Sequence, residues 1–384
     1  MPLLWLLAAV QIALGISVLV RMARSARGTP LGTGASTAAA GSIAVVVPVL
    51  NEVLRLAPCL DGLIGAGPDV REILVVDGGS TDGTHALVAR YAALDPRVRA
   101  IDAAPIPADW NGKAWGLECG LRASSPKATW IATIDADVRP AADLCARMAT
   151  HAVHADVPAL SIATRQELGD LGEGLLHPAM LTTLVYRYGL PGNVATRVAD
   201  VQANGQCFLA RRDVLLATDA FARARASICE DVTAARILVR AGHRVGFYEA
   251  GDLVVVRMHA NWRETWTNWP RSLTLRDELT PGLTVVGLAE IAFVQALPLA
   301  LVLGLAPISN ATPSAHVLFL TNVIFLMMRL GVLAGTYRAY RKPPWTYWLS
   351  PLADLPVTFA LISSALRRRH TWRGRALVIS GRTS

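Results

Sequence analysis

Acidic and amide side chains follow three separate apolar segments in the first half of the chain: Asn51, Glu52, Asp77, Asp135 and Asp137. A single Asp after such a segment is commonly a turn former. Three segments in succession that each end this way favour a shared binding site instead. Asp135 and Asp137 suit Mg²⁺ or Mn²⁺, because these cations prefer carboxylate oxygens and share their remaining positions with phosphate.

Phosphate binding needs positive charge, and the sequence offers few sources of it near these residues. No glycine-rich phosphate loop follows the first apolar segment, where Pro48-Val49-Leu50-Asn51-Glu52 stands. A divalent metal is therefore expected to neutralise the phosphates. Lys113, between Trp110 and Trp115, can add charge there. A solvated lysine on a loop is the alternative.

The elements that must position these side chains follow from the apolar pattern. Short continuous apolar runs at 43–49, 72–77 and 130–137 are typical of buried parallel strands, and helical stretches separate them. This alternation predicts an α/β domain with a mostly parallel sheet flanked by helices. Ligands of such sheets bind beyond the carboxyl ends of the strands, where the acidic and amide side chains fall.

A second polar group lies farther along the chain. Glu230 and Asp231 open a predicted helix. Acidic residues are also favoured there by the helix macrodipole, so capping is the alternative to a chemical role. The preceding segment 202–208 contains Asn204, Gly205 and Gln206. It lines an acceptor site in one interpretation and forms only a strand and its turn in the other.

The composition predicts a membrane protein. Of 384 residues, 53% are hydrophobic and 17% are charged, which excludes a disordered chain, a coiled coil and an ordinary soluble enzyme. The net charge is +8, yet 13 basic and only two acidic residues lie outside 40–281. The positive charge therefore belongs to the membrane flanks, which favours a lipid bilayer as partner and argues against nucleic acid.

Apolar segments indicate the membrane topology. Residues 1–20 carry no charge and precede Arg21, Arg24 and Arg27, so we expect a retained anchor whose C-terminal end is cytoplasmic; a cleaved signal is the alternative. Segments at about 283–308 and 315–336 are long enough to span a bilayer. These features predict an integral protein of the cell (inner) membrane with a cytoplasmic catalytic domain.

The last apolar segment, about 346–366, is expected to be interfacial or re-entrant, because a full crossing would place the basic tail outside. Arg329 either marks a polar path through the membrane or extends its side chain to the interface.

The five cysteines are far apart in the sequence, which is typical of reduced thiols that pack in the interior. The expected division of the chain is an anchor (1–27), a linker (28–41), an α/β domain (42–256), a Trp/Arg-rich interfacial segment (257–281) and a C-terminal membrane region (282–384).

Four motifs occur in a fixed order: Val47–Glu52, Val76–Thr84, Asp135-Ala136-Asp137 and Glu230-Asp231. Together, over about 40–280, they resemble family 2 glycosyltransferases, which are inverting enzymes with the GT-A fold. The membrane segments, with Trp110–Trp115 and Trp372-Arg373-Gly374-Arg375, are similar to the integral-membrane branch that glycosylates lipids. That branch includes hopanoid-associated, carotenoid and ceramide glycosyltransferases.

The resemblance implies a role for each matching position. Asp77 would bind the uracil end of a nucleotide sugar, and Asp137, with Asp135 beside it, would hold the metal that bridges the diphosphate. Asp231 would be the general base that deprotonates the acceptor hydroxyl. The implied donor-binding residues are Pro48, Leu50, Asn51, Glu52, Asp77, Gly79, Lys113 and Asp135. The residues implied on the acceptor or diphosphate side are Asn204, Gly205, Gln206, Glu230, Trp269 and Arg271.

The segment 257–271, just before the C-terminal membrane region, contains three Trp and three Arg residues. Trp is abundant at bilayer interfaces, so an interfacial helix is one interpretation. In the other, Trp269 and Arg271 correspond to the Q-x-x-R-W region of processive relatives. This chain has Trp-Pro-Arg without the usual Arg-Trp pair. The departure argues against polymer synthesis.

The expected function is transfer of a single hexose from a nucleotide sugar, with UDP-glucose as the expected donor, to a hydrophobic lipid acceptor at the cytoplasmic membrane face. The acceptor would be of carotenoid, hopanoid or sphingolipid type. A processive polysaccharide synthase is the alternative in the same class. A non-catalytic membrane binding module and a small transporter are the alternatives in other classes.

Overall fold

The computed structural model describes residues 2–32, 38–273, 275–367, 369–372 and 375–378. Parts of the predicted linker and basic tail, including Arg373 and Gly374, lie outside these residues. The chain forms two compact units. The sheet unit holds Gly28–Gln166 and Pro191–Met258 with a C-terminal hairpin, and the helical unit holds Met1–Arg27, Glu167–Leu190 and His259–Arg367.

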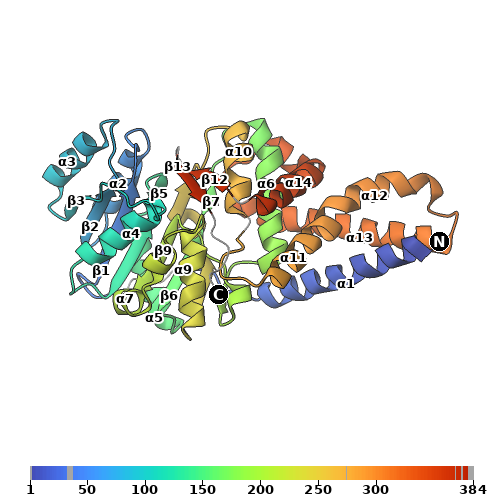
Figure 1. Ribbon diagram of the computed structural model, residues 1–384, viewed down its shortest axis with the longest axis horizontal. Helices are drawn as coiled ribbons and strands as arrows, with labels where there is room; N and C mark the ends of the chain where they lie inside the picture. The colour runs from blue at the N-terminus through green and yellow to red at the C-terminus, as the bar shows by residue number, and fades with distance from the viewer. Residues whose placement is uncertain (1, 33–37, 274, 368, 373–374, 379–384) are drawn as a thin grey trace. The chain divides into compact units, whose positions relative to one another are not determined.

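The sheet unit is built on one large sheet (Figure 1), in which eight strands are described, in the order β3-β2-β1-β4-β9-β6-β10-β8. Strands β8 and β9 run against the other six, so the sheet is mostly parallel, as predicted. The strands are β1 (Ile43–Val49), β2 (Val70–Asp77), β3 (Val98–Asp102), β4 (Trp130–Ile134), β6 (Ala159–Ala163), β8 (Asn193–Ala195), β9 (Cys207–Arg211) and β10 (Val245–Glu249).

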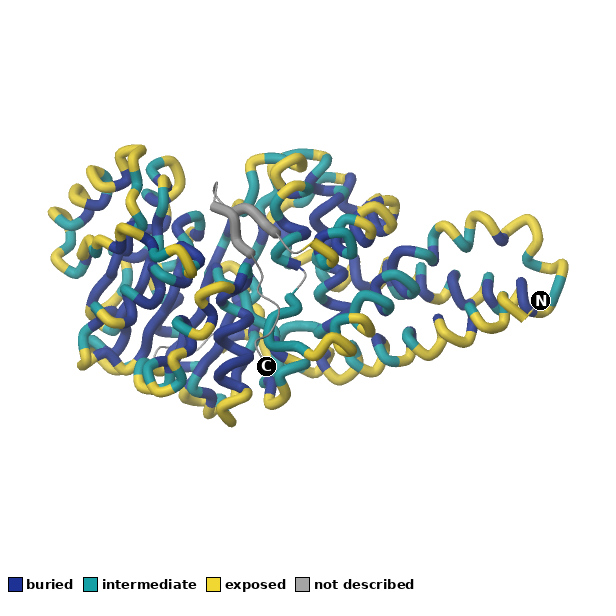
Figure 2. The backbone as a smooth tube through the Cα atoms, in the orientation of Figure 1, coloured by how far each residue is buried: buried dark blue, intermediate teal, exposed yellow. Residues whose placement is uncertain are grey.

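The continuous apolar runs of β1 and β2 are explained by burial on both faces (Figure 2). Val45 and Val47 of β1 pack into one core, and Val46 packs into the core on the opposite face. Successive strand residues point to opposite faces of the sheet. When both faces are covered, every side chain of the strand is buried, and apolar residues are favoured at each position. Strand β3 at the sheet edge has exposed positions, which explains why no continuous run marks it in the sequence.

Helices cover both faces of the sheet. On one face lie α2 (Leu56–Ile64), α3 (Thr84–Leu94) and α5 (Leu144–His154). On the other lie α4 (Gly112–Ala123), α7 (Arg212–Thr218), α8 (Ala220–Arg223) and α9 (Glu230–Arg240). The unit also contains the small sheet of β5 (Val138–Pro140), β11 (Val254–Val256) and β7 (Arg165–Gln166), the hairpin of β12 (Arg369–Trp372) and β13 (Arg375–Val378), and the 3₁₀ turns η1 (Val198–Asp200) and η2 (Gly251–Leu253).

Helix α4 lies unusually close to β1 because glycines line its inner face. A Cβ atom on Gly116 would lie 3.0 Å from Cβ of Pro48, and one on Gly120 would collide with Cγ1 of Val46. The absence of both side chains lets the helix backbone approach the strand. This approach places the start of α4, which carries Lys113, near the carboxyl end of the sheet.

The helical unit consists of long apolar helices and shorter helical turns. Four stretches within the described residues are long and apolar enough to cross a membrane: Pro2–Ser25, Pro281–Ile308, Pro313–Ala339 and Trp345–Leu366. They include each long apolar segment that the sequence predicts to span or enter the membrane, and their crossing of a bilayer stays a prediction. The elements are α1 (Pro2–Ser25), α6 (Leu171–Tyr188), α10 (Trp262–Ser272), α11 (Pro281–Glu290), η3 (Ile291–Ala296), α12 (Leu297–Leu305), η4 (Ala306–Ile308), α13 (Pro313–Thr336), η5 (Tyr337–Ala339), η6 (Trp345–Ala353) and α14 (Asp354–Leu366).

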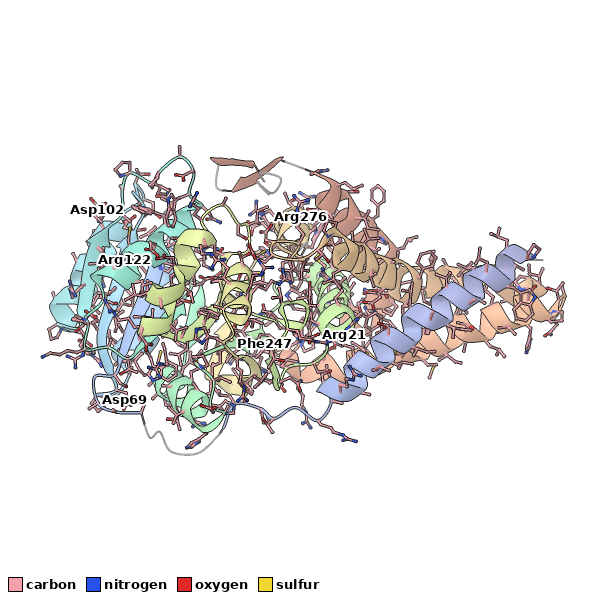
Figure 3. All side chains as sticks on the ribbon, turned by 60° about the horizontal axis from the view of Figure 1, so that its bottom comes forward. Arg21, Asp69, Asp102, Arg122, Phe247 and Arg276 are labelled. Carbon is pink, nitrogen blue, oxygen red and sulfur yellow. The ribbon has the colours of Figure 1, made fainter. Side chains whose placement is uncertain are left out.

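Buried ion pairs join the helices of this unit. Arg21, labelled in Figure 3, binds both carboxylate oxygens of Glu290 at 2.8 and 2.9 Å. Arg329 binds both oxygens of Asp354 at 2.8 and 3.0 Å, and both side chains are almost fully buried. The expectation that Arg329 extends to the interface is therefore wrong. Its charge is neutralised within the helical unit, because an unpaired guanidinium is very costly in an apolar interior.

Candidate functional site

The carboxyl ends of β1, β2 and β4 meet at one edge of the sheet. Val49 pairs with Asp77 across β1 and β2, and β4 pairs in parallel with the other side of β1. The antiparallel partner of β4 is β9, which brings Cys207 opposite Ile134 and so brings the preceding 204–206 turn to the same edge. Sheet topology therefore gathers the predicted donor-side and acceptor-side residues of the sheet unit.

Lys113 lies at the centre of this group. Its Nζ is 2.7 Å from Oδ1 of Asp135 and 2.9 Å from Oε1 of Glu230. Burial opposes the charged form of Lys113, but Asp135, Glu230 and Asp231 outweigh it and raise its pKa well above the ordinary value. The solvated loop lysine is therefore excluded. A single ammonium group joins the motif after β4 to the motif that opens α9.

Asn111 fixes the position of Lys113, a role that the sequence reasoning missed. The Asn111 side chain caps α4 by accepting a hydrogen bond from the backbone of Lys113 at 2.9 Å, and its Nδ2 donates to the carbonyl of Ser227 at 2.7 Å. The second bond ties the start of α4 to the segment that leads into α9. An Asn immediately before a helix is a strong capping signal and could have indicated the first contact.

Asp231 lies beside Lys113 and the backbone of Gly205. A Cβ atom on Gly205 would lie 2.6 Å from Nζ of Lys113 and 3.2 Å from Oδ2 of Asp231, so only glycine fits there without displacement. Burial and the neighbouring Glu230 carboxylate raise the pKa of Asp231 to about 7, against the opposing effect of Lys113. A carboxyl group that titrates near neutrality suits a general base.

Asp137 offers an unsatisfied carboxylate oxygen. Its Oδ1 is buried and accepts no hydrogen bond from the part of the chain that the structure describes. Burial and the nearby Asp135 carboxylate raise the pKa of Asp137 to about 7, which a bound cation would reverse. Among the described residues, no group of three or more His, Cys, Asp and Glu side chains could hold a metal. The unsatisfied Oδ1 of Asp137, with the Asp135 carboxylate nearby, fits a cation whose remaining ligands would come from phosphate.

Two loops interlock on the other side of this edge. The backbone of Asn51, at a φ of 57°, donates to Oγ of Ser80 at 2.8 Å, and Oδ1 of Asn51 accepts from the backbone of Thr81 at 2.8 Å. The backbone of Glu52 donates to Oγ1 of Thr84 at 3.0 Å. Half-buried Leu50 and Pro48 lie in or beside β1.

The turn at 204–206 is held by a buried polar network. Oε1 of Gln206 accepts from Oγ1 of Thr164 at 2.5 Å and from Nδ2 of Asn204 at 3.1 Å. The backbone of Asn204 donates to Oγ of Ser161 at 2.8 Å. Asn204 and Gln206 therefore support the turn that presents Gly205 to Lys113 and Asp231.

Trp269 and Arg271 belong to α10 of the helical unit. The N-cap of α6, Asp170, accepts a hydrogen bond from the backbone of Trp262 at the start of α10. Farther along the two helices, Glu173 contacts Thr265 and His177 contacts Trp269, so they pack in parallel. The Trp269 ring lies 4.1 Å from that of buried His177, and burial lowers the pKa of His177 to about 3. The Trp-rich segment is thus a packed helix within its unit.

The model of glycosyl transferase family 2 matches residues 44–215. The mannosyltransferase PcManGT from Pyrobaculum calidifontis, solved with GDP-Man and Mn²⁺, is similar at 19% identity and a TM-score of 0.54, over 94% of this chain and 99% of that chain. Glucosyl-3-phosphoglycerate synthase from Mycobacterium tuberculosis, solved with Mn²⁺, UDP and glucosyl-3-phosphoglycerate, is similar at 19% identity and a TM-score of 0.37. This match covers 67% of this chain and 82% of that chain.

No curated protein matches the chain. The likeness to the mannosyltransferase extends over nearly the whole chain and concerns the fold. The family match covers β1, β2, β4 and the Asp135-Ala136-Asp137 motif, and it ends in α7. Residues 44–215 therefore resemble glycosyl transferase family 2, and the sheet unit has the GT-A fold.

Proposed function

We propose that the protein transfers a single hexose from a UDP-hexose, with UDP-glucose as the first candidate, to a hydrophobic lipid acceptor. The observation that carries this proposal is the placement of Lys113 between Asp135 and Glu230. Lys113 and Asp135 lie in the segment 44–215 that matches the family 2 model. The ammonium group of Lys113 joins Asp135, which is assigned to the diphosphate side, to Glu230, which is assigned to the acceptor side. Transfer between two substrates needs both groups within reach of each other.

On the donor side, Asp77 and the interlocked loops at Asn51 and Gly79 border the nucleotide. Asp137, with Asp135 beside it, would hold Mg²⁺ or Mn²⁺, which would supply positive charge for the departing nucleoside diphosphate. Lys113 adds a positive charge at the same phosphates.

On the acceptor side, Asp231 takes the proton from the attacking hydroxyl. The hydroxyl oxygen forms the new bond to the anomeric carbon while the bond to the diphosphate breaks on the opposite face, so the configuration inverts. Glu230, which pairs with Lys113 in the free protein, keeps this positive charge beside Asp231. Trp269 and Arg271 of α10 are assigned to the acceptor by the family motif alone.

The four apolar stretches of the helical unit support a lipid acceptor and an integral membrane location. In this proposal, residues 42–256 form the cytoplasmic catalytic domain, residues 257–281 lie at the interface, and residues 1–27 and 282–384 anchor the chain in the cell (inner) membrane. The acceptor is of carotenoid, hopanoid or sphingolipid type, because a soluble donor domain tied to a membrane region serves a water-insoluble hydroxyl.

The test is lipid labelling by the purified protein in detergent with radiolabelled UDP-glucose, total host lipids, and Mn²⁺ or a chelator. GDP-mannose, the donor present in the solved mannosyltransferase, is assayed in parallel. We expect Mn²⁺-dependent label in an organic-soluble product. Asp231→Asn should lower its rate by about 10²- to 10⁴-fold, the usual contribution of a general base.

Other outcomes separate the alternatives. Label in long water-soluble chains would revive the polysaccharide synthase. No label and no nucleotide binding with any of several nucleotide sugars would favour the binding module. Nucleotide binding that survives Asp231→Asn while transfer is lost would place Asp231 in the chemical step and not in donor binding.

A further inference from the structure

One oxygen of the Asp77 carboxylate is saturated and the other is open. Oδ1 accepts three hydrogen bonds, from the backbone of Gly79 at 2.9 Å, the backbone of Ser80 at 2.8 Å and the hydroxyl of Ser80 at 2.8 Å. Oδ2 is buried and accepts no hydrogen bond from the described part of the chain. The residue is only 4% exposed, so an acceptor without a hydrogen bond here needs an explanation.

His85 lies next to this open oxygen. Its Nε2 is 3.1 Å from Oδ2 of Asp77. The orientation of the ring does not make this contact a hydrogen bond. His85 lies in the first turn of α3, and its side chain is 60% exposed, so the ring can adjust when a ligand arrives. With a proton on Nε2, the pair presents one donor and one acceptor side by side.

We infer that His85 and Asp77 together select uracil among the nucleobases. This inference rests on the proposed function, in which Asp77 lies at the base end of the donor. Uracil carries an N–H donor at N3 flanked by two carbonyl acceptors. The N3–H group donates to Oδ2 of Asp77, and one adjacent carbonyl accepts from Nε2 of His85.

The same geometry rejects the other bases. Guanine presents two adjacent donors, N1–H and the N2 amino group, which would need both oxygens of a carboxylate. Oδ1 of Asp77 already holds three donors, so the amino group would be buried without a partner. Cytosine presents an acceptor at N3, which would face the acceptor Oδ2. His85 is therefore a specificity-determining residue.

The first test is calorimetric binding of UDP, GDP and CDP to the full-length protein in detergent with Mn²⁺. We expect UDP to bind most tightly. His85→Ala should weaken UDP binding about tenfold, the effect of one lost hydrogen bond, and should reduce the preference for UDP over CDP. His85→Gln keeps an N–H donor and should recover part of the preference.

Unchanged or tighter UDP binding by His85→Ala would overturn the inference. Equal weakening of all three nucleotides would also overturn it, because a purely structural role does not change selectivity. Failure of the unaltered protein to bind any nucleotide would overturn the proposed function instead. The two failures are therefore distinguishable.

Asp77→Asn provides a second test that does not depend on His85. The three donors around Oδ1 should hold the amide oxygen there, which places the NH₂ group where Oδ2 now lies. That position then donates and suits the N3 acceptor of cytosine. We expect the preference to move from UDP toward CDP, and an unchanged order of affinities would exclude a contact between Asp77 and the edge of the base.

Discussion

Asp137 and Asp231 both have a raised pKa, and the neighbouring charge differs between them. Burial is the larger cause for each, but Asp137 faces the Asp135 carboxylate and Asp231 faces Glu230. Both values of about 7 mean that a substantial fraction of each carboxyl is protonated at neutral pH in the free protein. A cation at Asp137 would remove the proton there, whereas Asp231 needs to lose its proton to act as a base.

We predict that transfer activity falls as the pH decreases through about 7. The active form of Asp231 is the carboxylate, and its pKa is raised, so protonation removes activity at a higher pH than for an ordinary Asp. Below that point kcat should fall about tenfold per pH unit. A pH profile of lipid labelling at saturating substrates and Mn²⁺ measures it.

The Mn²⁺ concentration separates the two aspartates in this profile. Protons compete with the cation for Asp137, so a fall in activity that moves to lower pH as Mn²⁺ increases belongs to the metal side. A fall that stays in place at saturating Mn²⁺ belongs to Asp231. A flat profile between pH 5 and 8 would contradict the assignment of Asp231 as the base.

At the scale of single elements, the close approach of α4 to β1 carries a stability prediction. Gly120→Ala places a methyl group against Val46 and should destabilise the protein by about 1–3 kcal/mol, as overpacking of a filled core does. Thermal unfolding in detergent measures the change. The matched control is Gly120→Ala combined with Val46→Ala, which makes room, and the two changes should cost less than their sum.

The continuous apolar runs at β1, β2 and β4 made the sheet and its acidic edge predictable, because only strands buried on both faces have that pattern. The contact of Asn111 with Ser227 was not predictable, since 116 residues separate the partners and neither belongs to a periodic pattern. For the same reason, the sequence reasoning proposed that Lys113 adds charge at phosphates but did not identify Glu230 as its partner.

For the whole molecule, the buried pair of Arg329 and Asp354 is the clearest test of the helical unit. Arg329→Met leaves the Asp354 carboxylate buried without its cation, and this should destabilise the protein by about 3–5 kcal/mol. Arg329→Met with Asp354→Leu removes both charges and should recover most of the loss. Unfolding measurements in detergent on Arg329→Met, on Asp354→Leu alone and on the double variant complete the cycle with the unaltered protein. Equal stability of all variants would show that the pair contributes nothing.

The topology of the last apolar stretch is a second test at this scale. Trp345–Leu366 is long and apolar enough to cross a membrane, yet the bias of basic residues toward the cytoplasm favours an interfacial or re-entrant path. We predict that a reporter fused after Ser384 is cytoplasmic. A reporter fused after Tyr340 is the control, because a full crossing places the two reporters on opposite sides.

The shared ammonium group of Lys113 has a thermodynamic consequence for the order of events. Any anion that draws Nζ away from Glu230 leaves the acidic pair at the start of α9 with less positive charge beside it. Donor occupancy and the proton affinity of Asp231 are therefore linked, and linkage of this kind is reciprocal. A donor held through Lys113 makes Asp231 a stronger base, and deprotonation of Asp231 in turn competes for the charge that holds the donor.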